Sequence, residues 1–167
     1  MSNPRSAFMP GAAGATAIER WSLPEVEGNV IGRPVDEVFA VIRDVDRTPL
    51  WMPGLTEARI TSDGPLETGS TLLYRGTFLG RSYTMAALCA GLTENKHFAT
   101  TTTAGPFYLE TDSTFEPVAE GTQVTLTCRG ESRGFFKLAK PLVVRLSKKL
   151  WEAAAENLRV LMEDRAI

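Results

Sequence analysis

The strongest constraint on the fold is an amphipathic pattern in the last fifth of the chain, from Gly134 to about Asp164. Apolar residues recur there at spacings of three and four, which is typical of a helix with one buried face. A helix over this range would be roughly 45 Å long at ~1.5 Å per residue. Because most of the preceding chain alternates like strands, we expect this helix to lie across a β-sheet. The apolar stripe consists of Phe135, Leu138, Leu142, Leu146, Leu150, Ala153 and Leu161, with Ala139, Val143, Ala154, Leu158 and Met162 beside it.

A proline interrupts the start of this pattern. Pro141 lacks an N–H group, and its ring clashes with the carbonyl group four residues earlier in a continuous helix. The sequence therefore predicts either a kink between Lys137 and Pro141 or a helix that begins there.

The length and composition suit one globular domain. The chain has 167 residues, of which 43% are hydrophobic and 23% are charged, and these values allow a sizeable core. We expect a domain over residues 18–167 after a flexible tail over residues 1–17, which is rich in Gly, Ala, Pro and Ser. The tail has no long apolar run of the kind found in signal peptides or membrane spans.

The net charge and the cysteines exclude several functional classes. The formal charge of −2 and the pI near 5.5 give no general attraction to nucleic acid. Cys89 and Cys128 are far apart, and the chain has a single histidine, so neither a disulfide framework nor a metal site is predicted. We also find no glycine-rich phosphate loop before a helix. The chain is expected to be cytoplasmic, with no metal and no cofactor.

The remaining chain reads as an extended segment, two short helices and a meander of strands. The short connections between the strands imply antiparallel neighbours, so the class is α+β. The expected ranges are an extended segment over 18–31, a helix from Pro34 to about Asp44, a helical turn over 47–51, and strands over 55–61, 71–78, 81–92, 96–103, 107–117 and 122–130.

Alternation predicts which face of several strands points inward. The inward set comprises Leu72, Tyr74, Phe98, Thr100, Thr102, Phe107, Leu109, Thr111, Ser113, Phe115, Val124, Leu126 and Cys128. The strand over 81–92 has no decisive parity, and its inward face stays open.

This order of elements, together with several short motifs, resembles the START-like (SRPBCC) superfamily, in its polyketide cyclase/dehydrase and lipid-transport branch. The likeness covers residues 18–162. The motifs are Arg33-Pro34-Val35-Asp36-Glu37-Val38-Phe39, Asp44, Trp51-Met52-Pro53-Gly54, Gly69, Phe115-Glu116-Pro117 and Gly121-Thr122-Gln123-Val124-Thr125. The resemblance implies a helix-grip fold, in which a curved antiparallel sheet wraps around the long C-terminal helix and leaves a ligand cavity between them.

The predicted cavity mixes apolar groups with hydroxyl groups, which suits a hydrophobic or amphipathic small molecule. Trp51 resembles the family's tryptophan near the cavity rim, although it could equally lock the small helices to the sheet. The predicted ligand-binding residues are Trp51, Tyr74, Phe98, Thr100, Leu109, Thr111, Phe115, Leu126, Leu142 and Leu146.

Catalytic candidates are few. We expect His97 to be a surface hairpin residue, and Glu110 and Asp112 to share a solvated outer face, rather than to act in general acid–base chemistry. Some family cyclases orient a polyketide with pocket arginine, tyrosine and tryptophan side chains. Strand parity places Arg75 and Arg129 outside, so Arg81 is the one arginine that remains a catalytic candidate.

A basic run covers the first half of the C-terminal helix. Seven basic residues and one acidic residue lie between Arg129 and Lys149. The run is interpreted either as a solvated helix face or as a contact for anionic membranes. A third alternative is a homodimer contact through Val144 and Trp151, seven residues apart on the side away from the main stripe.

Three functions therefore follow from the sequence. The first is binding or transport of a lipid, isoprenoid or polyketide-like compound, which the lack of an assembled catalytic group favours. The second is a polyketide cyclase, aromatase or dehydratase. The third is a membrane-docking lipid-transfer module.

Overall fold

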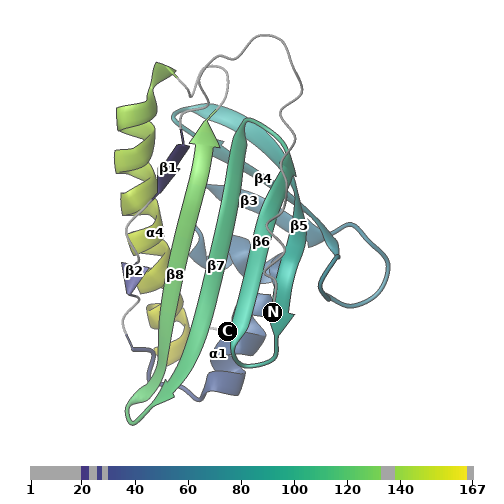
Figure 1. Ribbon diagram of the computed structural model, residues 1–167. Helices are drawn as coiled ribbons and strands as arrows, with labels where there is room; N and C mark the ends of the chain where they lie inside the picture. The colour runs from purple at the N-terminus through teal and green to yellow at the C-terminus, as the bar shows by residue number, and fades with distance from the viewer. Residues whose placement is uncertain (1–19, 23–25, 28–29, 133–137, 165–167) are drawn as a thin grey trace, which may run out of the picture.

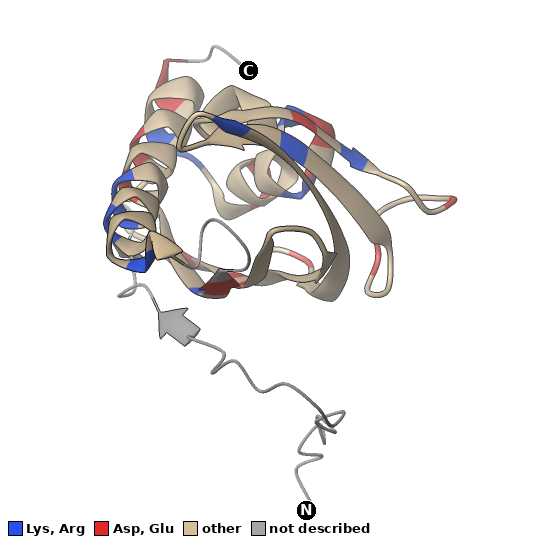
Figure 2. Ribbon diagram, turned by 90° about the horizontal axis from the view of Figure 1, so that it is seen from above, with Lys and Arg blue, Asp and Glu red and all other residues tan. Residues whose placement is uncertain are grey.

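The computed structural model describes residues 20–22, 26–27, 30–132 and 138–164. A strongly curved antiparallel sheet faces one long helix, α4 (Lys140–Glu163), and the small helices lie at one end of the sheet (Figure 1). In the view from above, the sheet forms an arc and α4 runs along its open side (Figure 2). The predicted α+β helix-grip architecture is confirmed. The predicted tail over residues 1–17 lies outside the described residues.

The sheet is a meander of hairpins closed at one edge by the N-terminal strands. Its order is β1-β8-β7-β6-β5-β4-β3, and β2 also pairs with β8. The single extended segment expected over 18–31 is thus two short strands on the same neighbour, followed by a bridge between Ile31 and Thr122. The strands are β1 (Arg20–Ser22), β2 (Val26–Glu27), β3 (Leu55–Ile60), β4 (Thr71–Phe78), β5 (Arg81–Thr93), β6 (His97–Ala104), β7 (Phe107–Val118) and β8 (Gly121–Ser132).

The two short helical segments occur where the sequence predicts them. Helix α1 (Val35–Arg43) buries Val38, Phe39 and Ile42 on one face, and Pro34 precedes it at the N-cap. A 3-10 turn, η1 (Val45–Arg47), then leads into α2 (Thr48–Trp51), which buries Trp51.

Helix α4 begins at Lys140, within the range where the sequence predicts either a kink or a helix start. Pro141 lies in its first turn, where a missing N–H group costs nothing. The expected helical residues 134–137 lie outside the described residues. At the other end, the Gly32 N–H group donates to Glu163 Oε1 at 3.1 Å, and the Asn157 side chain donates to the Trp51 carbonyl oxygen at 3.2 Å. The C-terminal half of α4 is therefore held to the chain around the small helices.

Two clusters of buried side chains fill the space between sheet and helices. The larger one joins α1, α2, the sheet and the C-terminal half of α4 through residues such as Phe39, Phe115 and Leu158. The Phe39 and Phe115 rings meet edge to face, with centroids 5.4 Å apart. The smaller cluster joins Met85, Phe107, Cys128 and Val143 near the start of α4.

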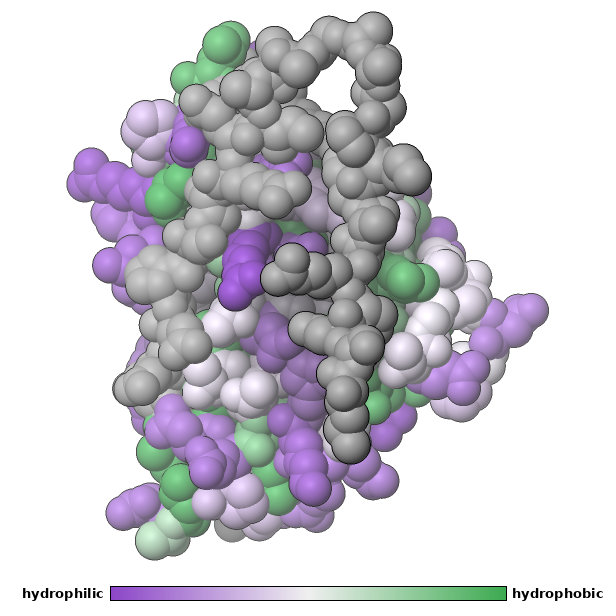
Figure 3. Space-filling view, in the orientation of Figure 1, coloured by the Kyte–Doolittle hydropathy of each residue, from purple (hydrophilic) through white to green (hydrophobic). Residues whose placement is uncertain are grey.

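The convex face of the sheet is polar. His97 Nε2 lies 2.8 Å from Asp112 Oδ2 on this face, and Glu110 is exposed. The His97 ring lies over Gly91, where an added Cβ would come within 2.9 Å of the ring. Figure 3 shows many hydrophilic residues on the uncovered parts of the face turned to the viewer. His97, Glu110 and Asp112 thus lie on the outer face, as predicted, and outside the cavity.

A membrane crossing demands a helix that is both long and apolar. Among the described helices, none meets both conditions for spanning a bilayer.

Candidate ligand cavity

A cavity of about 150 Å³ lies between the sheet and the first half of α4. Members of both buried clusters line it, among them Trp51 and Ala87 of the larger cluster and Met85 and Phe107 of the smaller one. The cavity therefore lies where the two clusters fail to meet.

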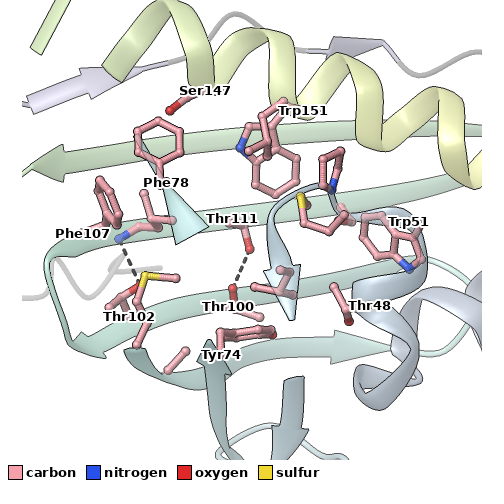
Figure 4. A pocket seen from close by; sticks show the side chains of 18 of the residues that line it. Thr48, Trp51, Tyr74, Phe78, Thr100, Thr102, Phe107, Thr111, Ser147 and Trp151 are labelled. Carbon is pink, nitrogen blue, oxygen red and sulfur yellow. Dashed lines mark hydrogen bonds between the residues drawn. The ribbon is translucent and has the colours of Figure 1, made fainter. Parts of the chain in front are cut away.

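Strands β4 to β7 form the floor of the cavity. Residues on adjacent antiparallel strands that lie directly opposite one another point to the same side of the sheet. The register pairs Tyr74 with Met85 and Thr100 with Thr111, and all four side chains line the cavity. Figure 4 shows Tyr74, Thr100 and Thr111 on the sheet, across the cavity from α4.

Helix α4 supplies the roof through Ser147, Leu150 and Trp151. Leu150 and Trp151 follow Ser147 by three and four residues, so all three lie on one side of the helix. The Trp151 side chain hydrogen-bonds to the Cys128 thiol on β8, which fixes the indole ring against the sheet. Burial raises the pKa of Cys128 to about 12, and the hydrogen bond from Trp151 opposes that shift.

A glycine on β4 makes room for a tyrosine at the cavity wall. A Cβ atom at Gly76 would come within 2.5 Å of the Gly54 carbonyl oxygen and 2.7 Å of the Tyr83 hydroxyl oxygen. Gly76 and Tyr83 are also partners in the register between β4 and β5. The absence of a side chain at residue 76 therefore lets the Tyr83 phenol lie flat over the sheet.

The polar side chains among the described lining residues are all uncharged. Two of the threonine hydroxyls bond to each other, with Thr100 Oγ1 and Thr111 Oγ1 2.6 Å apart, and Thr102 Oγ1 accepts from the Leu109 N–H group at 3.2 Å (Figure 4). None of the described lining residues is Asp, Glu, Lys, Arg or His. The hydroxyl-bearing lining residues are Thr48, Tyr74, Tyr83, Thr100, Thr102, Thr111, Ser113 and Ser147.

Burial keeps the phenols protonated. Desolvation raises the pKa of Tyr74 well above its usual value, with a smaller contribution from nearby Cys89, and desolvation also raises the pKa of Tyr83. At neutral pH both groups are neutral hydrogen-bond donors. The lining residues that the structure describes can therefore offer a guest molecule hydrogen bonds but no charge.

Metal binding has no structural basis in the described part of the chain. No group of three or more His, Cys, Asp or Glu side chains is gathered there in a way that would hold an ion.

A comparison with protein families shows which family the chain belongs to. The sequence profile described as "Polyketide cyclase / dehydrase and lipid transport" matches residues 24–163. The chain belongs to this family. A comparison with curated proteins found no significant match.

Solved structures share the fold of this family member, although their sequences are only distantly similar to it. The protein TTHA0849 from Thermus thermophilus is 16% identical, with a TM-score of 0.72 over 89% of this chain and 100% of that chain. A START superfamily protein from Mycobacterium smegmatis is 17% identical, with a TM-score of 0.66 over 87% and 98%. The Zhui aromatase/cyclase from Streptomyces sp. R1128 is 12% identical, with a TM-score of 0.71 over 90% and 97%. The START-like fold predicted from the sequence motifs is thereby confirmed.

The structure brings together six of the ten predicted ligand-binding residues of this family member around the cavity. These are Trp51, Tyr74, Phe98, Thr100, Leu109 and Thr111. Phe115 and Leu126 also point inward, but they are buried in the larger cluster and do not line the cavity.

The two predicted residues on α4 lie elsewhere. Leu142 is 47% exposed, so its predicted inward orientation is wrong, and the half-buried Leu146 does not line the cavity. Trp151 and Val144, placed outside by the homodimer hypothesis, instead pack inward with the smaller cluster. The apolar stripe of α4 is wider than the cavity. The residues at the centre of the stripe are therefore not the residues that line the cavity.

Arg81, the candidate for cyclase chemistry, is exposed at the start of β5 and does not line the cavity. Sequence reasoning also missed Tyr83 and Met85, because two register shifts disturb the pairing of β5 with β6. The pairing of β5 with β4 has no such shift. A tight turn at Leu79–Gly80 pairs Tyr74 with Met85. The predicted inward position of Tyr74 could therefore have identified Met85 as an inward residue as well.

Proposed function

We propose that this protein binds and carries a neutral, mainly apolar small molecule in the cavity beneath α4. The observation that carries the proposal is the lining itself, which combines an apolar wall with hydroxyl groups and has no charged side chain among its described residues. A charged ligand would lose its hydration there without gaining an ion pair, and this cost disfavours it strongly. The family's description includes both lipid transport and cyclase roles, and the lining supports the binding role.

The volume limits what the cavity holds. An engineered protein cavity of about 150 Å³ accommodates a molecule such as benzene, whereas drug-sized ligands occupy roughly 300 Å³ or more. A guest of one or two rings, or one such portion of a lipid, isoprenoid or polyketide-like molecule, therefore matches the cavity of about 150 Å³. Larger guests require α4 or a hairpin to move.

The hydroxyl groups favour a ligand that carries one hydrogen-bonding oxygen. Tyr74 offers a protonated phenol, and the Thr100–Thr111 pair lies on the adjacent strands β6 and β7. A hydroxyl or carbonyl oxygen on the guest would satisfy these groups better than a hydrocarbon, because buried polar groups without partners are costly.

The cyclase alternative has less support. Its arginine, Arg81, is exposed, and the similarity to an aromatase/cyclase rests on 12% identity. Tyr74 is a lining residue that could act as an acid, but its raised pKa makes it a poor proton donor at neutral pH.

Fluorescence titration with 2-naphthol tests the proposal, because this probe is neutral, has two rings and carries one hydroxyl group. We expect saturable binding with a dissociation constant on the order of 10 to 100 µM, since association costs offset much of the apolar gain. The matched anionic probe, 2-naphthol-6-sulfonate, should bind at least about tenfold more weakly. Equal binding of the two probes, or binding of neither, would refute a neutral ligand cavity.

A pair of variants tests whether 2-naphthol binds inside the cavity. Ala87 lines the cavity, whereas Ala86 is its neighbour on the opposite face of β5. Ala87→Leu should fill part of the cavity and reduce 2-naphthol binding, and Ala86→Leu should leave it unchanged. If Ala87→Leu fails to fold, Ser113→Leu tests the same space from β7. Retained binding in a folded cavity variant would show that the probe binds elsewhere.

A further inference from the structure

A strip on the outward face of α4 combines exposed leucines with basic residues. Leu138, just before the helix, is 88% exposed, and Leu142 in the first turn is 47% exposed. Arg145 and Lys149 are exposed as well, and they follow Leu142 by three and seven residues, so they continue the same side of the helix. We call Leu138, Leu142, Arg145, Lys148 and Lys149 the α4 strip.

The charge of this region is positive. Residues 138–151 contain four basic residues and no acidic one, and acidic residues return at Glu152. Lys148 approaches Glu152 at 3.9 Å. Arg145 and Lys149 have no ion pair with any residue that the structure describes. Figure 2 shows blue on one half of α4 and red toward its C-terminal end.

The rest of the protein does not explain this concentration of charge. The chain as a whole carries a formal charge of −2, so the positive surface is local to one half of one helix. Leu138 and Leu142 are also exposed only four residues apart, and adjoining exposed apolar side chains point to an interaction site more than single ones do. Figure 3 shows hydrophobic surface at the end of the molecule where α4 begins, beside the hydrophilic surface along the helix.

We propose that the α4 strip docks the protein onto anionic lipid bilayers. The leucines enter the boundary between headgroups and acyl chains, and the basic side chains bind the lipid phosphates and carboxylates. A nucleic acid would match the charges but would leave Leu138 and Leu142 without an apolar partner, whereas a bilayer supplies both. The combination of both side-chain types in one strip is what selects a membrane.

The same half of α4 covers the cavity with its other side. Ser147, Leu150 and Trp151 line the cavity, while Leu142, Arg145 and Lys149 face outward. Docking would therefore place the roof of the cavity against the lipid surface. This inference does not rest on the proposed ligand, because the α4 strip and the cavity lining share no residue.

Sedimentation with lipid vesicles tests the docking surface. The full chain should bind vesicles of phosphatidylcholine mixed with phosphatidylserine and should not bind phosphatidylcholine alone. Rising salt should weaken binding, because ions screen the attraction. Each basic residue near an anionic surface contributes roughly a fivefold gain in affinity. Arg145→Glu with Lys149→Glu should therefore reduce the partition coefficient by at least about 25-fold.

Matched controls separate local contact from general charge and hydrophobicity. Arg59→Glu on β3 with Lys96→Glu in the turn between β5 and β6 makes the same change in net charge away from α4, and should leave vesicle binding largely intact. Leu142→Ser should weaken binding about tenfold, whereas the same change at Leu50, which is 55% exposed on α2, should not.

Three results would overturn the docking proposal. One is a wild-type protein that ignores anionic vesicles, and another is an α4 strip variant that binds them normally. The third is a loss of binding on charge reversal with no effect of Leu142→Ser, which would indicate a polyanion partner such as nucleic acid. Binding of 2-naphthol, measured in the same variants, should be unchanged, so failure of docking and failure of the ligand cavity give different patterns.

Discussion

The hydroxyl pair in the cavity makes a prediction that can be worked out quantitatively. Thr100 and Thr111 lie opposite each other on β6 and β7, with their oxygens 2.6 Å apart. Replacing one of them by valine keeps the side-chain shape but leaves the other hydroxyl group in an apolar cavity without its partner. Such an unsatisfied group costs about 1–3 kcal/mol.

The double variant, Thr100→Val with Thr111→Val, removes both hydroxyls and fills the same volume. Replacing both partners by apolar groups of the same shape is nearly neutral, so we expect its unfolding free energy to lie within about 1 kcal/mol of the wild type. Each single variant should lose about 1–2 kcal/mol. The coupling energy from the double-mutant cycle, measured by urea unfolding, should therefore be about 1–3 kcal/mol in magnitude.

The chain provides a matched control outside the cavity. Thr61 Oγ1 and Thr71 Oγ1 are 2.8 Å apart, and both residues are exposed. Water replaces the lost partner there, so the same cycle of valine substitutions should give a coupling below about 0.5 kcal/mol. If the Thr100 and Thr111 variants were additive within that margin, the hydroxyl pair would not be a buried, mutually dependent feature of the cavity.

Three further predictions follow from other contacts. Gly76→Ala should reduce the unfolding free energy by about 1–3 kcal/mol, because its Cβ would press on a backbone carbonyl oxygen, whereas Gly32→Ala, whose Cβ meets nothing closer than 3.5 Å, should change thermal stability little. Cys89 and Cys128 are buried, and burial raises the pKa of both thiols, so neither should react with Ellman's reagent at pH 8 until the protein is unfolded; rapid labelling of the folded protein would contradict this. Cys128 and Tyr74 have a raised pKa, so they keep their protons in the folded state at pH values where the unfolded chain loses them. The unfolding free energy should therefore be constant below about pH 8 and fall as the pH rises from about 9 toward 12, by roughly 1.4 kcal/mol per pH unit for each such group. An unfolding free energy that rises over this range in urea titrations would show the sign to be wrong.

The meander of antiparallel strands and much of the cavity floor could be predicted from the sequence because alternation is a local property. Phe107, Leu109, Thr111 and Ser113 face one way wherever β7 is regular, and all four line the cavity. Turn residues set the ends of the strands. The pattern therefore predicts both the meander and the composition of the floor.

The roof could not be predicted in the same way. An apolar stripe shows that α4 has a buried side, but it does not show which part of that side meets packed core and which part meets a cavity. The periodicity places Trp151 on the side away from the main stripe, yet it packs inward, where its side chain hydrogen-bonds to Cys128 on β8. Leu142 matches the periodicity but falls in the first turn and is exposed. Both outcomes depend on tertiary contacts.

The uneven burial of α4 has a consequence for how the protein would respond to a guest. Val143 is the one fully buried residue in the first half, whereas Ala154, Ala155, Leu158 and Met162 anchor the second half. The half that lacks packing is the half above the cavity, so an incoming molecule would supply contacts that the chain itself does not make. Amide hydrogens in the first half of α4 should exchange faster than those nearer Glu163. A ligand bound in the cavity should slow this exchange, so the exchange rate of the first half would report whether the cavity is occupied.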